Sequence, residues 1–129
     1  MGSDFGVDMD KVREFVARKT RARNAALDER FQRATLDFRA IVERIIDEAK
    51  PKRIYQWGSL LHRERFSEIS DIDIAVEGLT GAEQFFQVLG IAMDGTSFPV
   101  DVVEIEKVPE SVERRIREKG KLVYERTDP

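Results

Sequence analysis

The sequence predicts one α/β domain in which helices flank a small β-sheet, with a long helical region before it. Up to residue 50, apolar residues recur every three or four positions, which is the period of an amphipathic helix. Three short stretches rich in β-branched residues follow, and segments with helical character separate them. Hydrophobic residues make up 41% of the 129 residues, which is enough to build a core and argues against disorder.

The first predicted element is helical and extends to about Lys50, as one helix or two, with Asp8 or Asp10 as its N-cap. Before residue 27 it is rich in Arg and Lys and its apolar pattern is weaker, which fits a separate helix or an arm. After that point an apolar stripe predicts a face that lies across the sheet. The stripe consists of Leu27, Phe31, Ala34, Phe38, Ile41 and Ile45. We therefore divide the chain into an N-terminal helical region, residues 1–50, and a core, residues 51–129.

Pro51 ends the helical region, and strands and helices then alternate. The predicted strands are residues 53–57, 71–76 and 98–105, and residues 121–125 form an extended tail. Helical segments are predicted at residues 60–66, from 80 or 81 to 92, and from 109 to 119. The inner face of the middle helix is predicted to consist of Phe85, Phe86, Leu89 and Met93.

Charge and composition exclude several classes of function. The 22 Lys and Arg residues nearly balance 25 Asp and Glu residues, so a net charge of −3 gives no general attraction to nucleic acids or anionic membranes. The absence of Cys excludes disulfides, thiolate zinc sites and cysteine nucleophiles. No apolar run approaches the roughly 20 residues of a membrane span, and the N-terminus lacks a secretory signal pattern. We expect a soluble cytoplasmic domain.

Two carboxylates share one face of the second predicted strand. Asp71 and Asp73 are two residues apart and point to the same side, while Ile72, Ile74 and Val76 point to the other side, toward the core. Like charges held this close repel each other and raise each other's pKa. A divalent cation removes that cost, and oxygen-only ligands suit Mg²⁺ or Mn²⁺.

A third carboxylate, Asp101, interrupts the apolar run of the next predicted strand between Val100 and Val102. If the two strands are neighbours, Asp101 can meet the Asp71 and Asp73 pair and complete a site for one or two metal ions. The alternative is that all three are solvent-facing carboxylates on an edge strand. We favour the metal site because the three acids accompany a Gly-Ser turn upstream.

Gly58 and Ser59 stand between the first predicted strand and the following helical turns. Glycine allows a phosphate to approach the backbone, and the start of a helix offers unpaired N–H donors. The Ser59 hydroxyl adds another donor. Eleven residues separate this pair from Asp71.

The stretches Trp57–Ser59, Ser70–Val76 and Val100–Val103 together resemble the DNA polymerase β-type nucleotidyltransferase superfamily, most closely its minimal nucleotidyltransferase (MNT) branch. The similarity extends from about Lys52 to Tyr124. It implies a nucleotidyltransferase fold with a small mixed sheet, Mg²⁺ or Mn²⁺ as cofactor, and a nucleoside triphosphate such as ATP as substrate.

The resemblance also implies roles for individual residues. Asp71, Asp73 and Asp101 would be the catalytic residues and the metal ligands, and Asp101 would position and activate the acceptor hydroxyl. Gly58 and Ser59 would bind the phosphates.

The sequence departs from the family pattern near the phosphate-binding turn. Many members have Arg directly after Gly-Ser and ten residues before the first Asp, whereas this chain has Leu60 and an eleven-residue spacer. Arg63 and Arg65 are therefore the candidate phosphate-binding cations.

Other polar residues are interpreted as surface positions. His62 and Glu104 are expected to be solvated, as are the cations Arg114, Arg115 and Arg117.

For function, the resemblance implies transfer of AMP from ATP to a hydroxyl. The expected acceptor is a tyrosine of a partner HEPN-domain toxin, as in antitoxin-type protein AMPylation. One alternative is transfer to a small molecule such as an antibiotic, with the site shared across a homodimer. Another is a non-catalytic module that binds a nucleotide or a partner.

Overall fold

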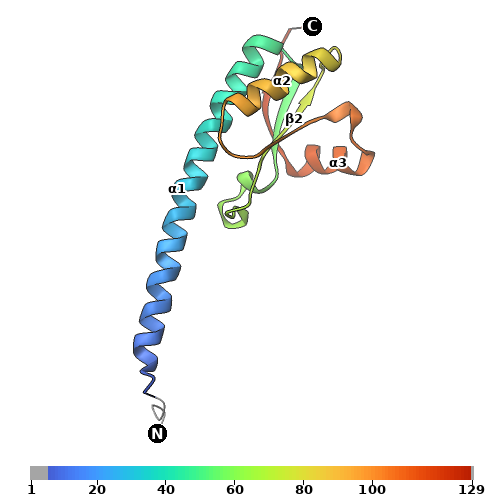
Figure 1. Ribbon diagram of the computed structural model, residues 1–129. Helices are drawn as coiled ribbons and strands as arrows, with labels where there is room; N and C mark the ends of the chain where they lie inside the picture. Colours follow the sequence, from blue (N-terminus) through green and yellow to red (C-terminus); the bar gives the residue numbers. More distant parts are fainter. Residues whose placement is uncertain (1–5, 129) are drawn as a thin grey trace.

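The computed structural model describes residues 6–128 and shows a four-stranded sheet with helices on both faces (Figure 1). The strand order is β3-β2-β1-β4; β2 and β3 run parallel, and the other neighbours are antiparallel. The elements are α1 (Met9–Ala49), β1 (Arg53–Trp57), η1 (Ser59–Leu61), η2 (Arg63–Arg65), β2 (Ile72–Glu77), α2 (Ala82–Asp94), β3 (Val100–Glu104), η3 (Ile105–Lys107), α3 (Glu110–Lys119) and β4 (Lys121–Glu125). The predicted small mixed sheet flanked by helices is confirmed, and the predicted tail is its fourth strand.

The N-terminal region is one unbroken helix, α1. Asp8 is its N-cap, and its side chain accepts hydrogen bonds from the backbone N–H groups of Asp10 (3.0 Å) and Lys11 (3.3 Å). Lys50 ends the helix in the left-handed conformation, directly before Pro51. Between these two ends the sequence contains neither Gly nor Pro, so nothing interrupts the helical hydrogen bonds.

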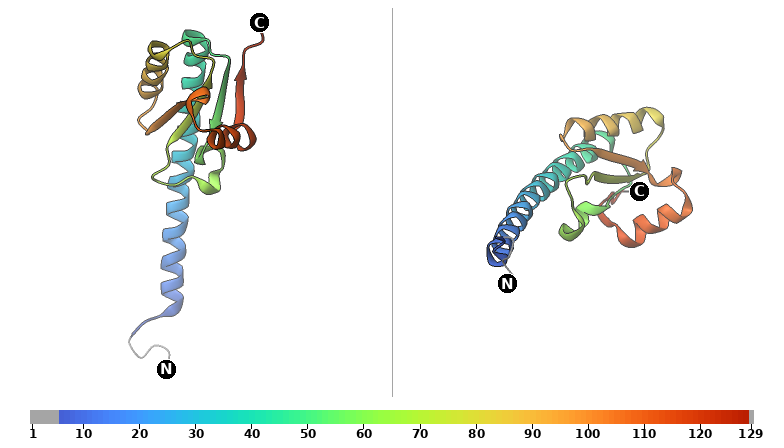
Figure 2. Two further views of the ribbon diagram at one scale, coloured as in Figure 1. Left: turned by 90° about the vertical axis from the view of Figure 1, so that its right-hand side faces the viewer. Right: turned by 60° about the horizontal axis from the view of Figure 1, so that its bottom comes forward.

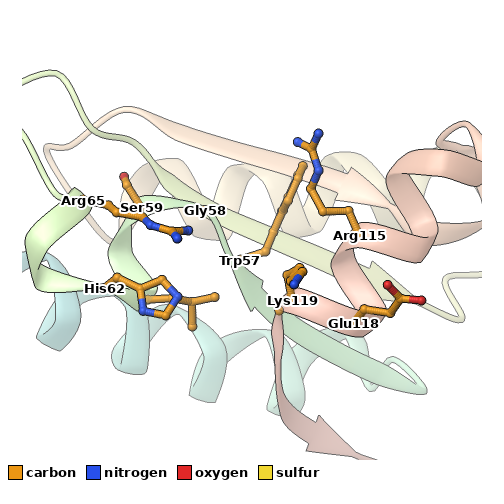
Figure 3. A pocket seen from close by; sticks show the side chains of 10 residues that line it. Trp57, Gly58, Ser59, His62, Arg65, Arg115, Glu118 and Lys119 are labelled. Atoms are coloured by element: carbon orange, nitrogen blue, oxygen red, sulfur yellow. The ribbon is translucent and has the colours of Figure 1, made fainter.

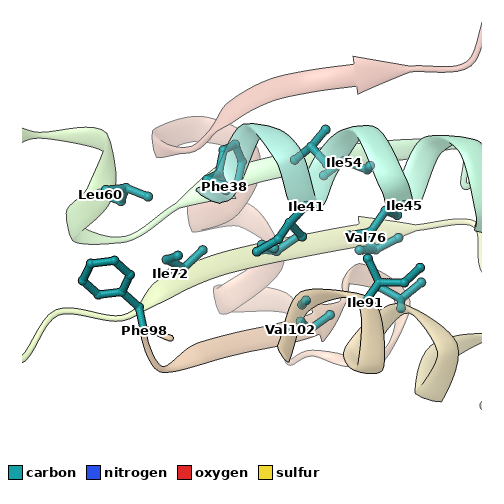
Figure 4. Close-up of a cluster of buried hydrophobic side chains, with 14 of the residues drawn as sticks. Phe38, Ile41, Ile45, Ile54, Leu60, Ile72, Val76, Ile91, Phe98 and Val102 are labelled. Atoms are coloured by element: carbon teal, nitrogen blue, oxygen red, sulfur yellow. The ribbon is translucent and has the colours of Figure 1, made fainter. Parts of the chain in front are cut away.

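The two halves of α1 have different surroundings. In the C-terminal half the predicted stripe is buried against the sheet and α2 from Ala34 onward, with Ala34, Ile41 and Ile45 at 0% exposure, whereas Leu27 and Phe31 are only half-buried (Figure 4). Residues 9–26, which we call the arm, are exposed at every position and extend beyond the sheet (Figure 1). Phe15 and Val16 are about half exposed there, at 50% and 54%.

Helix α2 lies beside α1 on the same face of the sheet, and its predicted inner face is confirmed in part: Phe85 and Leu89 pack half-buried against the core, but the helix is rotated relative to the prediction. Val88, Ile91 and Ala92 are buried, whereas Phe86 and Met93 are 65% and 63% exposed. Because α2 is apolar over most of its circumference, periodicity alone did not identify the side that faces the sheet.

Helix α3 covers the opposite face of the sheet (Figure 2). Ile116 is fully buried against Tyr55 and Ala75. Arg117 donates hydrogen bonds to Glu77 Oε2 (3.0 Å) and to the Tyr55 hydroxyl (3.1 Å). Burial raises the pKa of Glu77, but hydrogen bonds from Arg117 and Arg53 outweigh it and lower the pKa below its usual value. These contacts fix α3 against β1 and β2.

Across residues 6–128, no helix combines the length and the hydrophobicity needed to cross a bilayer.

Candidate active site

The register of the sheet brings two of the predicted site carboxylates to neighbouring positions. Asp73 of β2 pairs with Asp101 of β3, and on its other side with Trp57 of β1. Paired residues of adjacent strands point to the same face and lie about 5 Å apart. Asp73, Asp101 and Trp57 therefore share the face that α3 covers. The two strands are therefore neighbours, which is the condition under which Asp101 can meet the acidic pair.

Asp71 lies immediately before β2, two residues from Asp73, and is exposed, as is Asp101. Asp73 is half-buried. Burial, and then the negative charges of Asp101 and Asp71, raise the pKa of the Asp73 carboxyl to about 7. The three carboxylates are thus electrostatically coupled, and a bound cation would remove the repulsion among them.

Within residues 6–128, no three Asp, Glu, His or Cys side chains converge closely enough to hold a metal ion in their present positions. The donor atoms nevertheless fit a divalent cation. The negative charge of Asp73 is disfavoured by burial and by the charges of Asp101 and Asp71, and all three side chains offer the carboxylate oxygens that such cations prefer. Asp71, Asp73 and Asp101 are the residues that would hold Mg²⁺ or Mn²⁺.

Gly58 lies directly against Asp73. Its φ of +82° falls in the region that favours glycine, and a Cβ added there would overlap the Asp73 carboxylate. Gly58 is followed by the short η1 helix, which begins at Ser59. The Gly-Ser turn and the acidic pair, separated in sequence, are therefore neighbours in the fold.

A cavity of about 760 Å³ opens beside this turn, between β1, η1 and α3 (Figure 3). Its volume is in the range of small-molecule binding sites. The lining residues are Trp57, Gly58, Ser59, Leu61, His62, Arg65, Arg115, Glu118, Lys119 and Gly120.

The structure separates the two arginines that the sequence proposed for phosphate binding. Arg65 lines the cavity, as do Gly58 and Ser59. Arg63 instead forms an ion pair with Asp28 and donates a hydrogen bond to the Asn24 carbonyl oxygen (3.1 Å), so it fastens the η2 turn to α1.

For three further residues the structure adds to or corrects the sequence prediction. His62 is exposed as predicted, but it also lines the cavity, and so does Arg115. Glu104, expected to be solvated, has a side chain only 10% exposed and pairs with Lys107 at 3.0 Å. These residues were missed because their surroundings depend on tertiary packing. Helix α3 packs across the sheet and places its C-terminal turns beside Ser59, which no local sequence pattern indicates.

Coupled carboxylates on adjacent parallel strands, next to a Gly-Ser turn and a cavity, are typical of α/β domains that transfer phosphate-containing groups. The family model described as "Polymerase beta, Nucleotidyltransferase" matches residues 39–129, and the chain belongs to this family. The resemblance inferred from the sequence is thereby confirmed at the level of the superfamily. The match begins within α1 and includes only the end of that helix, residues 39–49, so the buried Ala34 and Phe38 lie outside it. No curated protein matches the chain.

Proposed function

We propose that this protein is a metal-dependent nucleotidyltransferase that moves AMP from ATP to a hydroxyl of a partner protein, a tyrosine of a HEPN-domain toxin. The observation that carries the proposal is the coupling of Asp73 with Asp101 and Asp71 on one face of the sheet. A cation bound there would neutralise phosphate charge and polarise the α-phosphorus.

The residues of the chain supply the remaining parts of the reaction. Ser59 and the backbone N–H groups at the start of η1 bind phosphate oxygens, which Gly58 allows to approach closely. Asp101 accepts the proton of the acceptor hydroxyl. The acceptor oxygen forms a bond to the α-phosphorus, the bond to the β-phosphate oxygen breaks, and pyrophosphate leaves.

Two features support a protein as the acceptor. Asp71 and Asp101 are exposed, so a hydroxyl carried by a macromolecule can reach them. The arm also presents apolar side chains that no other described element covers, including Val12, Phe15 and Val16. A protein partner provides a surface that can bury them.

The test is transfer of label from α-labelled ATP, with Mg²⁺, to a co-expressed HEPN-domain partner. We expect labelling by the wild type and none by the Asp71→Asn, Asp73→Asn double variant. Asp47→Asn, which changes an exposed carboxylate far along α1, is the control and should label normally. Labelling by the double variant would contradict the proposal.

The same assay separates the alternatives. Label that appears on a small hydroxyl compound, with a site completed by a second copy of the chain, would favour the small-molecule enzyme. No transfer, and no thermal stabilisation by ATP and Mg²⁺ at millimolar concentration, would favour a non-catalytic module that binds a partner.

A further inference from the structure

The cations of α3 fall into two groups with different partners. Arg114 pairs with Glu110 (3.8 Å), and Arg117 pairs with Glu77 and Glu113 (both 3.0 Å). In the part of the chain that the structure describes, Arg115 and Lys119 form no ion pair, and both line the cavity. They are four residues apart and so lie on one side of the helix, one turn from each other.

The cavity is therefore cationic opposite the Gly-Ser turn. Figure 3 shows Ser59 and Arg65 on one side and Arg115 and Lys119 on the other. Arg65 also forms no ion pair among residues 6–128, and Glu118 is the single carboxylate that lines the cavity. Three positive charges facing one negative charge disfavour a cation there and favour an anion.

A second observation concerns Trp57, which also lines the cavity. The indole Nε1 of Trp57 is buried and has no hydrogen-bond acceptor within residues 6–128. Trp57 can only donate at this atom, and a buried donor without an acceptor is costly. A ligand rich in oxygen acceptors would pair with the guanidinium groups of Arg65 and Arg115 and with the Lys119 ammonium group, which line the same cavity.

We propose that Arg115 and Lys119 of α3, together with Arg65, form the subsite for the β- and γ-phosphates of the nucleoside triphosphate. This inference rests on the proposed function and assigns the phosphate tail to the α3 side of the cavity. Because the β- and γ-phosphates leave as pyrophosphate, these cations also hold the leaving group. Substituting these cations should therefore mainly weaken the binding of triphosphates.

Trp57 provides the measurement, because it is the only Trp in the chain and lines the cavity. Its fluorescence should respond to ligands without any added label. The ligands are a non-hydrolysable ATP analogue, AMP and inorganic tripolyphosphate, each titrated with Mg²⁺. The variants are Arg115→Gln, Lys119→Gln and their combination, and circular dichroism checks that each remains folded.

We expect each single variant to weaken binding of the ATP analogue and of tripolyphosphate about tenfold or more, since each removes one charge-assisted contact. Binding of AMP should change less than about threefold, because AMP lacks the two phosphates. Arg114→Gln, which changes the neighbouring cation that is already paired with Glu110, should bind all three ligands as the wild type does.

Unchanged affinity for the ATP analogue in the double variant would overturn the inference, and so would an equal loss for AMP. Tripolyphosphate separates this inference from the proposed function. If it binds through Arg115 and Lys119 while no label is transferred to a protein, the subsite stands and the proposed reaction fails. If wild-type protein binds neither triphosphate nor tripolyphosphate, the subsite fails.

Discussion

The two faces of the sheet are built from the same strands but are opposite in character. Toward α1 and α2, β2 presents Ile72, Ile74 and Val76, all at 0% exposure. Toward α3, it presents Ala75 and the half-buried Asp73, whose charge is disfavoured. Burial of apolar side chains on the α1 and α2 face stabilises the fold. This stability allows the α3 face to keep the Asp73 carboxylate, which destabilises the protein when no cation is bound.

The largest expected effect comes from removing that group. Asp73→Asn should lower the proposed nucleotidyl transfer by about a thousandfold, because it removes a charge that would hold the metal ion next to the phosphates. The variant should fold at least as stably as the wild type in the absence of metal, since the amide carries no disfavoured charge. Initial rates of label transfer and urea unfolding measure the two properties. A normal rate of label transfer by this variant would mean that Asp73 is not needed for the reaction, and that the α3 face is not the catalytic one.

On the other face, Ile74→Ala should lower the free energy of unfolding by about 2–5 kcal/mol, because it opens a cavity in a fully buried position. The matched control is Val103→Ala on β3, a half-buried residue on the α3 face, for which we expect about 1 kcal/mol. Urea denaturation followed by circular dichroism gives both values. Equal losses would mean that both faces contribute alike to stability.

The pH dependence of stability isolates Asp73. Its pKa is about 7 in the folded protein against an ordinary value of 3.8, so between these pH values the folded state holds a proton that the unfolded chain has lost. This residue's contribution to stability is therefore full below about pH 4, falls as pH rises, and is lost above about pH 7. The wild type, measured with EDTA, should lose stability over this window relative to Asp73→Asn. Parallel stability curves would contradict the raised pKa.

The smallest effect is expected on the arm. Phe15→Ala should change the free energy of unfolding by less than about 0.5 kcal/mol, because Phe15 is 50% exposed and lies in a stretch of α1 that is exposed at every position. Phe38→Ala, the same change at a position 4% exposed on the same helix, should cost about 3–5 kcal/mol. Thermal melts of the two variants make the comparison, and a large loss for Phe15→Ala would show that something covers the arm.

Local patterns were sufficient to predict the elements and the apolar face of α1 because both depend on residue spacing. They also predicted that Asp71 and Asp73 share a face, since side chains alternate along a strand. They gave only part of the buried face of α2 and did not reveal the pairing of residues 121–125 with β1, because these depend on which elements meet. The same limit applies to Arg115 and Arg63: one reaches the cavity and the other pairs with Asp28, and only the packing of α3 and α1 decides this.

The continuity of α1 has a mechanical consequence. Its core half packs on the sheet beside α2, and no Gly or Pro offers a hinge between residues 9 and 49. The 18 residues of the arm therefore form a rigid helical extension about 27 Å long, and the packed half of α1 sets its direction. A partner bound at the N-terminal end of the arm would be held at a fixed distance and direction from the carboxylates. A force applied there would be transmitted along α1 to the sheet.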